Sequence, residues 1–389
     1  MLKTSCLAFF CMAAFATRGA EYPLLLVAGY GSNNVVMFDP QSGDWSQLLS
    51  LKAASRPRGI TIGDAGELYL GLHSQSKDIL KFSPTDDYQE PSTLRRQIGR
   101  YGPGILAWHP YGIYTSGDTE RVMLRIDPVT GRAAGITQKN CCNVVGVLVA
   151  GNRMFAGEYF QRSILQYDLT KELPKGHRLV DRSPHLNRPM GMAVGHNGNL
   201  YVSNGLEPTV VEFDINTGDF IRTFANLGSA AQEGIYGLAY VSGVERYYLT
   251  TGAEVHELDR HGDLLASYHS PALRKGYGIT TVPARHRSTL LSAAKTLRTR
   301  RSSSTNPTTE ARPARKISIL KSTSGRLQIS GSIGDQYRVS ATTNFTTWQD
   351  IGVMENKFGT VKFKDPVANR FNRRFYRFKI VQNSQKPGL

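Results

Sequence analysis

Cysteine, tryptophan and long hydrophobic runs are scarce in this chain of 389 residues. It contains four cysteines and three tryptophans, and two of the cysteines, Cys6 and Cys11, lie near the N-terminus. The other two, Cys141 and Cys142, are adjacent, so the chain is not a small disulfide scaffold. No apolar run beyond the N-terminal one approaches the about 20 residues that a membrane-spanning helix needs.

The composition is otherwise that of a folded protein. Apolar residues make up 40% and charged residues 20% of the chain, and there are 38 glycines. These values exclude collagen, a coiled coil and wholesale disorder. The length exceeds the usual range of about 100 to 200 residues per domain, so we expect several domains or one large repeat architecture.

Residues 1–20 predict a secretory signal peptide. Lys3 precedes an apolar run from Cys6 to Phe15, and Ala14 and Ala16 form a small-x-small cleavage motif. The run of about ten to twelve apolar residues is too short to span a membrane. We therefore expect a secreted, periplasmic or cell-surface protein with no transmembrane helix in the mature chain.

A repeat of about 44 residues covers most of the chain. A short apolar strand ends at Asp or Ser every 41 to 46 residues, at Asp39, Ser83, Asp127, Asp168, Asp214 and Asp259. Each copy predicts four short antiparallel strands, which in the fifth copy read PMGMAVG, LYVSN, VVEFD and FIRTF. Six such units predict a six-bladed β-propeller. The recurring acids precede turns, where we expect them to accept backbone hydrogen bonds.

The two ends of this repeat region complement each other. The first copy begins at LLLVAG, which matches a second strand, and GYGITTV (Gly276 to Val282) repeats the first-strand pattern with nothing after it. Pairing of these segments would close one blade and remove an exposed sheet edge. We therefore place a closed propeller at residues 21–282.

The repeat resembles known propeller families at the residues just quoted. GNLYVSN and PMGMAV are similar to the core of the NHL consensus, and GSNNVVMFDPQSG is similar to its second half. The chain thus resembles NHL and SMP-30/gluconolactonase-like six-bladed propellers and, more loosely, the virginiamycin B lyase group. Such propellers include binding proteins and enzymes, so the resemblance implies a fold but leaves both function classes open.

Two further segments follow the propeller. Residues 283–316 hold nine Lys or Arg and one Glu, which predicts a basic, solvated linker rich in Ser, Thr and Arg. The stretch STLLSAAKTLRTRR could form one or two turns of a basic amphipathic helix, but a solvated spacer is the favoured interpretation. Strand patterns resume in residues 317–389 and predict a small β-sandwich accessory domain, so the fold class is all-β. Its segments GDQYRVSATTNFTTWQDIG, GTVKFKDP and NRRFYRFKI resemble a C-terminal module of exported proteins from Verrucomicrobia, which implies a bacterial origin.

The net charge of +16 does not lie on the propeller. The linker and the sandwich carry +8 each and the N-terminal segment +2, which leaves −2 for residues 21–282. A propeller without excess positive charge lacks the electrostatic support for nucleic-acid binding. The basic C-terminal region predicts attachment to an anionic envelope polymer, with solvated charge of no function as an equal alternative.

Loop lengths indicate which propeller face binds a ligand. Loops that join the second and third strands, and loops that enter the next blade, are longer and more varied than the other turns. We call their side the variable face and the opposite side the short-turn face. Candidate ligand residues on the variable face are Tyr30, Asn33, Arg58, His73, Asp118, Cys141, Cys142, Glu158, Tyr159, Asn204, Glu207 and Glu233. A solvated loop or a local hydrogen bond is the simpler explanation for each polar one.

Two chemical alternatives concern these residues. Asp118, Glu158, Asn204 and Glu233 could supply oxygen ligands to Ca²⁺ or Mg²⁺, the kind of central ion that the gluconolactonase resemblance implies for lactone hydrolysis. The Glu-Gly-Pro segment of that family has no counterpart in this sequence. The adjacent cysteines carry either free thiols or a strained disulfide, since neighbouring Cα atoms are 3.8 Å apart and disulfides usually need about 4.4 Å or more.

The function expected from the sequence is binding. We predict a secreted NHL-like propeller that binds a small molecule, glycan or protein on its variable face without catalysis. The alternatives are a metal-dependent lactonase-like hydrolase or lyase and a structural envelope protein. No HExxH motif, nucleophile elbow or P-loop occurs, so no catalytic residue is named.

Overall fold

The computed structural model describes most of the propeller and parts of the C-terminal region. The described residues are 22–73, 76–99, 102–117, 122–137, 143–171, 174–304, 318–321, 326–330, 336–343, 347–355, 360–371 and 374–381. The predicted signal peptide, Asp118, Cys141 and Cys142 lie outside this part of the chain, so the predictions made for them are not addressed by the structure.

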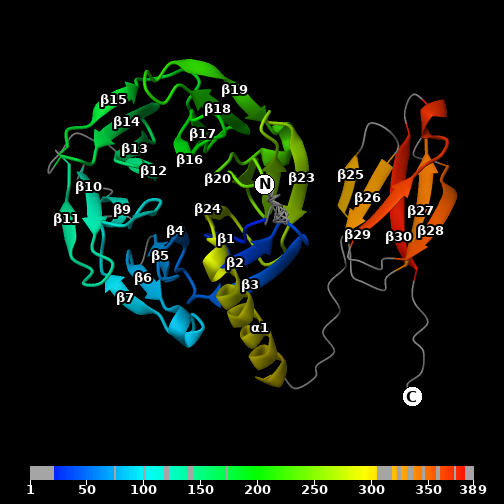
Figure 1. Cartoon of the computed structure of the whole chain (residues 1–389), viewed down its shortest axis with the longest axis horizontal. Helices are drawn as coiled ribbons and strands as arrows, with labels where there is room; N and C mark the ends of the chain where they lie inside the picture. The colour runs from blue at the N-terminus through cyan, green and yellow to red at the C-terminus, as the bar shows by residue number, and fades with distance from the viewer. Residues whose placement is uncertain are drawn as a thin grey trace, which may run out of the picture.

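Six four-stranded antiparallel sheets form a ring around a central channel (Figure 1). From the channel outward, blade 1 consists of β24 (Gly276–Thr281), β1 (Leu25–Gly29), β2 (Asn34–Asp39) and β3 (Asp44–Ser50); blade 2 of β4 (Pro57–Ile62), β5 (Leu68–Leu72), β6 (Ile79–Phe82) and β7 (Ser92–Arg95); and blade 3 of β8 (Ala107–His109), β9 (Gly112–Gly117), β10 (Val122–Ile126) and β11 (Ala133–Gly135). Blade 4 consists of β12 (Val144–Ala150), β13 (Arg153–Glu158), β14 (Ser163–Asp168) and β15 (His177–Val180); blade 5 of β16 (Pro189–Val194), β17 (Leu200–Asn204), β18 (Thr209–Phe213) and β19 (Phe220–Asn226); and blade 6 of β20 (Gly237–Val241), β21 (Arg246–Thr250), β22 (Glu254–Leu258) and β23 (Leu264–His269). The predicted all-β, six-bladed propeller is confirmed.

The predicted closure of the ring is also confirmed. Strand β24 pairs antiparallel with β1, with Leu25 opposite Thr281 and Val27 opposite Ile279. Figure 1 shows the yellow β24 beside the blue β1, inside blade 1. Early and late segments of the propeller therefore share one sheet, which leaves no unpaired inner edge at the seam.

One glycine per blade lets neighbouring inner strands touch. These glycines are Gly59, Gly104, Gly146, Gly191, Gly237 and Gly278. A Cβ atom on Gly146 would lie 2.0 Å from the carbonyl oxygen of Met190, and one on Gly278 would lie 2.5 Å from that of Arg58. At the other four positions a backbone atom of the next blade would lie 2.3 to 2.7 Å away. No side chain fits at such distances, which explains the early glycine of each repeat.

The recurring turn residues are structural, as predicted. Asp127 accepts hydrogen bonds from the backbone N–H groups of Val129 and Thr130, at 3.0 and 2.6 Å. Ser83, which replaces Asp in the second copy, accepts one from the N–H of Thr85 at 3.2 Å. These contacts close the turn between the third and fourth strands on the short-turn face.

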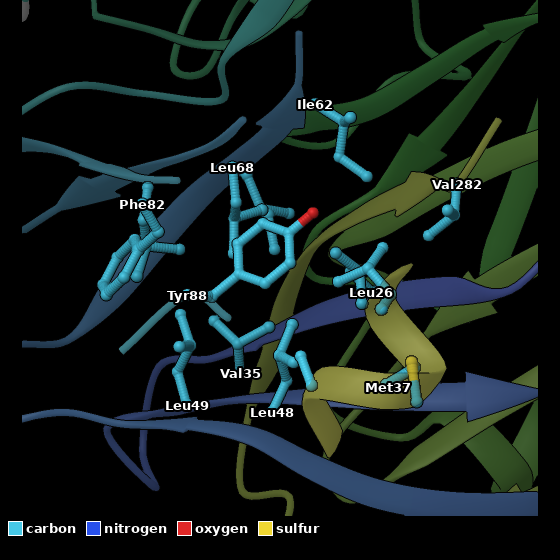
Figure 2. Packing of buried hydrophobic residues seen from close by; sticks show 14 of the residues in the cluster. Leu26, Val35, Met37, Leu48, Leu49, Ile62, Leu68, Phe82, Tyr88 and Val282 are labelled. Atoms are coloured by element: carbon cyan, nitrogen blue, oxygen red, sulfur yellow. The ribbon is translucent and has the colours of Figure 1, made fainter. Parts of the chain in front are cut away.

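A helix replaces the first part of the predicted linker. A 3₁₀ turn (η3, Ala284–His286) leads into α1 (Arg287–Ser304), and Leu290, Ala293 and Ala294 are buried. They belong to a cluster of buried hydrophobic residues from blades 1 and 2, part of which is shown in Figure 2. The interpretation of this stretch as solvated spacer is therefore wrong, because three apolar residues at positions i, i+3 and i+4 form a buried stripe within a basic segment.

Polar contacts pin the start of the helix to the short-turn face. Arg287 forms an ion pair with Asp39 at 2.8 Å and donates a hydrogen bond to the carbonyl oxygen of Tyr22, also at 2.8 Å. Arg285 forms an ion pair with Asp64 at 3.2 Å. Among the described residues, no helix is both long and apolar enough to cross a membrane.

The C-terminal strands form two three-stranded antiparallel sheets. One contains β25 (Ser318–Lys321), β26 (Arg326–Ser330) and β29 (Thr360–Lys364), and the other β28 (Gln349–Glu355), β27 (Gln336–Thr342) and β30 (Phe375–Val381). A Cβ atom on Gly352 of β28 would lie 3.3 Å from Phe363 of β29, so strands of the two sheets lie in contact. The predicted small sandwich stays a prediction.

Residues of the predicted C-terminal module motif meet around one buried carboxylate. Asp365 forms an ion pair with Arg374 at 2.7 Å, accepts a hydrogen bond from the Tyr376 hydroxyl at 2.9 Å and accepts another from the N–H of Val367 at 3.0 Å. These contacts give the motif a structural role. The resemblance to the Verrucomicrobia module stays a prediction.

Candidate ligand site at the mouth of the central channel

The inner strands begin on the variable face, so the residues at their starts surround the channel mouth. The residue before each inner-strand glycine belongs to this ring, and these residues are Arg58, Pro103, Val145, Met190, Tyr236 and Tyr277. Among them, Val145, Met190 and Tyr236 form a small buried cluster on which Tyr159 and Tyr277 pack. The mouth is therefore lined by one layer of side chains directly above the glycine ring.

Three tyrosines stack across this mouth, and we call Tyr30, Tyr236 and Tyr277 the tyrosine plug. The rings of Tyr236 and Tyr277 are nearly parallel, with an interplanar angle of 8° and centroids 4.5 Å apart. Tyr30 reaches the stack from the β1–β2 loop, with its centroid 4.7 Å from that of Tyr277. Contacts of this kind hold the rings in fixed positions, so the buried Tyr236 supports the half-buried rings of Tyr277 and Tyr30, which form a preformed aromatic surface.

Hydrogen bonds fix the plug at two points. The Tyr236 hydroxyl donates to the carbonyl oxygen of Glu233 at 2.9 Å, and the Thr250 hydroxyl donates to the carbonyl oxygen of Tyr277 at 3.1 Å. Burial raises the pKa of Tyr277 to about 12, so its phenol stays protonated near neutral pH. Burial, followed by the charge of Glu233, also raises the pKa of Tyr236.

Arginine side chains flank these rings. The guanidinium carbon of Arg58 lies 5.7 Å from the ring centroid of Tyr277, and that of Arg56 lies 5.8 Å from the centroid of Tyr30. Across the mouth, Arg188 lies 4.9 Å from the centroid of Tyr159 and donates a hydrogen bond to its hydroxyl at 3.1 Å. These are cation–π distances, so positive charge lies against aromatic rings on both sides of the channel.

His73 lies in a region of positive potential, beside Arg56 and Arg58 at the edge of the channel mouth formed by blades 1 and 2. Its Nδ1 atom lies 3.2 Å from the Tyr30 hydroxyl, within hydrogen-bond distance. Burial and then the charges of Arg58 and Arg56 lower the pKa of His73 to about 4. The imidazole is therefore neutral at pH 7, and a further positive charge beside it is unfavourable.

The structure brings several of the predicted site residues together. Tyr30, Arg58 and His73 lie within one set of contacts, and Tyr159 packs on the cluster next to the plug. Glu233 is exposed beside Tyr236. The set predicted from the sequence lacks Tyr236, Tyr277, Arg56 and Arg188, of which Tyr277 lies within an inner strand and Tyr236 directly precedes one. The repeat itself held the signal, since two of these four residues precede an inner-strand glycine.

Two predicted site residues instead hold the loops of the variable face. Asn33 accepts a hydrogen bond from the N–H of Arg56 at 2.8 Å. Asn204 is fully buried, where it accepts from the N–H of Asn187 at 2.8 Å and donates to the carbonyl oxygen of His185 at 3.0 Å. Asn204 is therefore not available on the ligand surface, whereas Asn33 is half-buried and its place among the ligand residues stays a prediction.

Glu158 and Glu207 are engaged in a similar way. Glu158 is fully buried and forms an ion pair with Arg178 of the outer strand at 3.6 Å, and Glu207 accepts a hydrogen bond from Asn187 at 2.9 Å. In the described ranges, no three His, Cys, Asp or Glu side chains are grouped closely enough to hold a metal ion. Of the set proposed for Ca²⁺ or Mg²⁺, Glu158 and Asn204 are thus bonded to other protein groups and Asp118 lies outside the described residues, so the metal site stays a prediction and we derive no chemistry through it.

Comparisons with known proteins concern the fold. No family model matches the chain, and no curated protein does. A chain in the crystal structure of a nidogen/laminin complex is similar, with a TM-score of 0.57 and 13% identity over 67% of this chain and 98% of the matched one. A protein of unknown function from Bacteroides caccae has a TM-score of 0.52 and 13% identity over 67% and 99% of the two chains.

These two matches show a β-propeller fold. A catalytically inactive variant of virginiamycin B lyase from Staphylococcus aureus, solved with quinupristin, has a TM-score of 0.48 and 11% identity over 68% of this chain and 93% of the lyase. Identities of this size establish no shared activity. The more specific resemblance to NHL and SMP-30 propellers therefore stays a prediction.

Proposed function

We propose that this chain is a secreted, non-catalytic propeller that binds its ligand on the tyrosine plug. The observation that carries the proposal is the aromatic stack at the channel mouth, with arginines against its rings on both sides. Preformed, largely apolar surfaces with a few fixed polar groups are typical ligand sites. The predicted C-terminal sandwich and the basic segment that precedes it would then serve as an accessory or attachment module.

The protonation of the plug favours binding over catalysis. A general base works best when its pKa lies near the working pH. The phenol of Tyr277, with a pKa of about 12, stays protonated, and the imidazole of His73, with a pKa of about 4, is a weak base. A protein ligand also falls within the proposal, since one of the matched chains belongs to a nidogen/laminin complex.

A binding screen with matched variants tests this proposal. The probes are a panel of neutral and acidic oligosaccharides, titrated calorimetrically into the mature chain. Tyr236→Ala removes half of the parallel ring pair and should weaken binding at least tenfold. Tyr111→Ala is the control, because Tyr111 is 70% exposed in the β8–β9 turn on the short-turn face.

Two results would contradict the proposal. One is equal binding by Tyr236→Ala and the wild-type chain, provided that the two chains melt alike. The other is Ca²⁺- or Mg²⁺-dependent hydrolysis of glucono-δ-lactone, which would establish the enzymatic alternative. Tyr277→Phe keeps the ring and removes only the hydroxyl, so it should bind more tightly than Tyr236→Ala and separates loss of stacking from loss of a hydrogen bond.

A further inference from the structure

Arg58 differs from most of the partly buried arginines of the propeller. Its side chain is half-buried and its Nε atom is fully buried, yet no described residue accepts a hydrogen bond from that atom or pairs with its charge. Three other half-buried arginines each pair with a carboxylate at 2.8 to 3.5 Å, namely Arg222, Arg246 and Arg287. Burial of the Nε atom without an acceptor is unfavourable, and the guanidinium group has no carboxylate partner among the described residues, so Arg58 is available to bind an anion.

A second arginine without a carboxylate partner among the described residues lies across the mouth. Within the described part of the chain, the contacts of Arg188 are with the rings of Tyr159 and Phe160 and with the Tyr159 hydroxyl, and no carboxylate faces it. Arg58 precedes the inner glycine of blade 2, and Arg188 lies at the start of the inner strand of blade 5. In a ring of six blades these two blades are opposite each other, so the arginines approach the plug from opposite sides.

The surface between the two arginines combines ring faces with hydroxyl groups. Tyr30 and Tyr277 supply both, and Phe160, 61% exposed, extends the apolar surface beyond Arg188. The low pKa of His73 agrees with a positive potential on the Arg58 side. Glu233 is exposed on the blade 6 side, next to Tyr236, so the negative group of a ligand is favoured at Arg58 and not there.

We propose that the ligand of the plug is an acidic oligosaccharide, with one anionic group at Arg58, a second at Arg188 and a sugar ring on the tyrosines between them. This inference rests on the proposed function. A guanidinium group can bind a carboxylate or a sulfate through two parallel hydrogen bonds. A sugar ring presents an apolar face to an aromatic ring and hydroxyl groups at its edges, which the amphipathic tyrosine side chain matches.

Calorimetric titration of the mature chain tests the ligand class. The probes are a short oligogalacturonate, the same oligosaccharide with its carboxylates methyl-esterified, and a sulfated galactan oligosaccharide. We expect the oligogalacturonate to bind and its methyl ester to bind at least tenfold more weakly, because each ester removes a charge-assisted hydrogen bond. Binding of the sulfated probe alone would keep the acidic class and identify sulfate as its anionic group.

Matched variants locate the anion. Arg58→Gln and Arg188→Gln should each weaken binding of the acidic probe at least tenfold and leave binding of the methyl ester unchanged. Arg95→Gln, on the exposed outer strand β7, removes the same charge far from the mouth and should change neither. Arg58→Lys, which keeps the charge and loses the forked donor geometry, provides an intermediate value if Arg58→Gln fails to fold.

The outcomes separate this inference from the proposed function. Equal affinity for acid and ester, or unchanged affinity in folded Arg58→Gln, overturns the acidic ligand. If neutral sugars then bind and Tyr236→Ala abolishes that binding, the plug remains a ligand site. Absence of binding by all acidic probes also overturns the inference.

Discussion

Helix α1 should be part of the propeller, and Leu290→Ala measures how much it contributes. Leu290 is fully buried in the cluster shared with blades 1 and 2. Removal of three carbon atoms from such a site leaves a cavity and typically costs about 3 kcal/mol. For a domain of this size each kcal/mol lowers the melting temperature by about 2 °C, so we expect a decrease of about 6 °C.

Truncation extends the same test. A chain that ends at Val282 loses Leu290, the buried Ala293 and Ala294, and the ion pair between Arg287 and Asp39. A chain that ends at Ser304 keeps them all. Differential scanning calorimetry should therefore show a larger decrease for the shorter chain than for Leu290→Ala.

The control uses the same helix. Ser292 is exposed, so Ser292→Ala should change the free energy of unfolding by less than about 0.5 kcal/mol. Equal melting temperatures for the chains ending at Val282 and Ser304 would refute the packing described here. They would instead restore the linker that composition alone suggests.

Three more predictions concern the ring, the mouth and the C-terminal sheets. Gly146→Ala should destabilise the propeller by about 2 kcal/mol or more, because its Cβ would meet a backbone oxygen at 2.0 Å. Gly243→Ala is the control, because a Cβ there has no atom within 4 Å. Equal melting temperatures of the two variants would contradict the close contact between inner strands at Gly146. His73 should titrate near pH 4 by NMR instead of 6.5, and Arg58→Gln should raise that pKa. Because the unfolded chain binds the proton more tightly than the folded chain, the free energy of unfolding should decrease as the pH falls from 6.5 towards 4. A midpoint near 6.5 would show that the imidazole is neither buried nor beside the arginines. Asp365→Asn leaves a buried guanidinium without its anion, which should cost about 3 kcal/mol and speed hydrogen exchange in β27 and β30; unchanged exchange would rule out a stabilising role.

The resemblance to known propellers and the spacing of turn residues both lead to the same fold. Asp127 and Ser83 differ in type, yet each accepts the hydrogen bond that its turn requires. Register in a short antiparallel blade depends on local turns and on alternation of apolar residues, and both are written in contiguous sequence. For this reason the number of blades and the closing strand could be predicted without coordinates.

The helix could not be decided in the same way, since the sequence allowed one or two amphipathic turns in this stretch but favoured a solvated spacer. Leu290, Ala293 and Ala294 form a short apolar stripe in a segment dominated by Arg, Ser and Thr. Whether such a stripe is buried depends on a surface that accepts it, and that surface is built from blades 1 and 2. Helical stability in proteins comes mainly from this kind of packing and less from intrinsic propensity.

The sequence by itself determined the ring, because a repeat of strands, turns and one glycine specifies each of five blades, and the two ends of the repeat region together specify blade 1. Only the tertiary structure decided which side chains form the candidate site. Tyr30 and Tyr277 belong to opposite ends of the repeat region and stack because ring closure brings their strands together. Glu158 and Asn204, which looked equally suitable in the sequence, are buried and bonded within their own blades and loops. Convergence of side chains from different blades is a property of the closed ring, and no single repeat contains it.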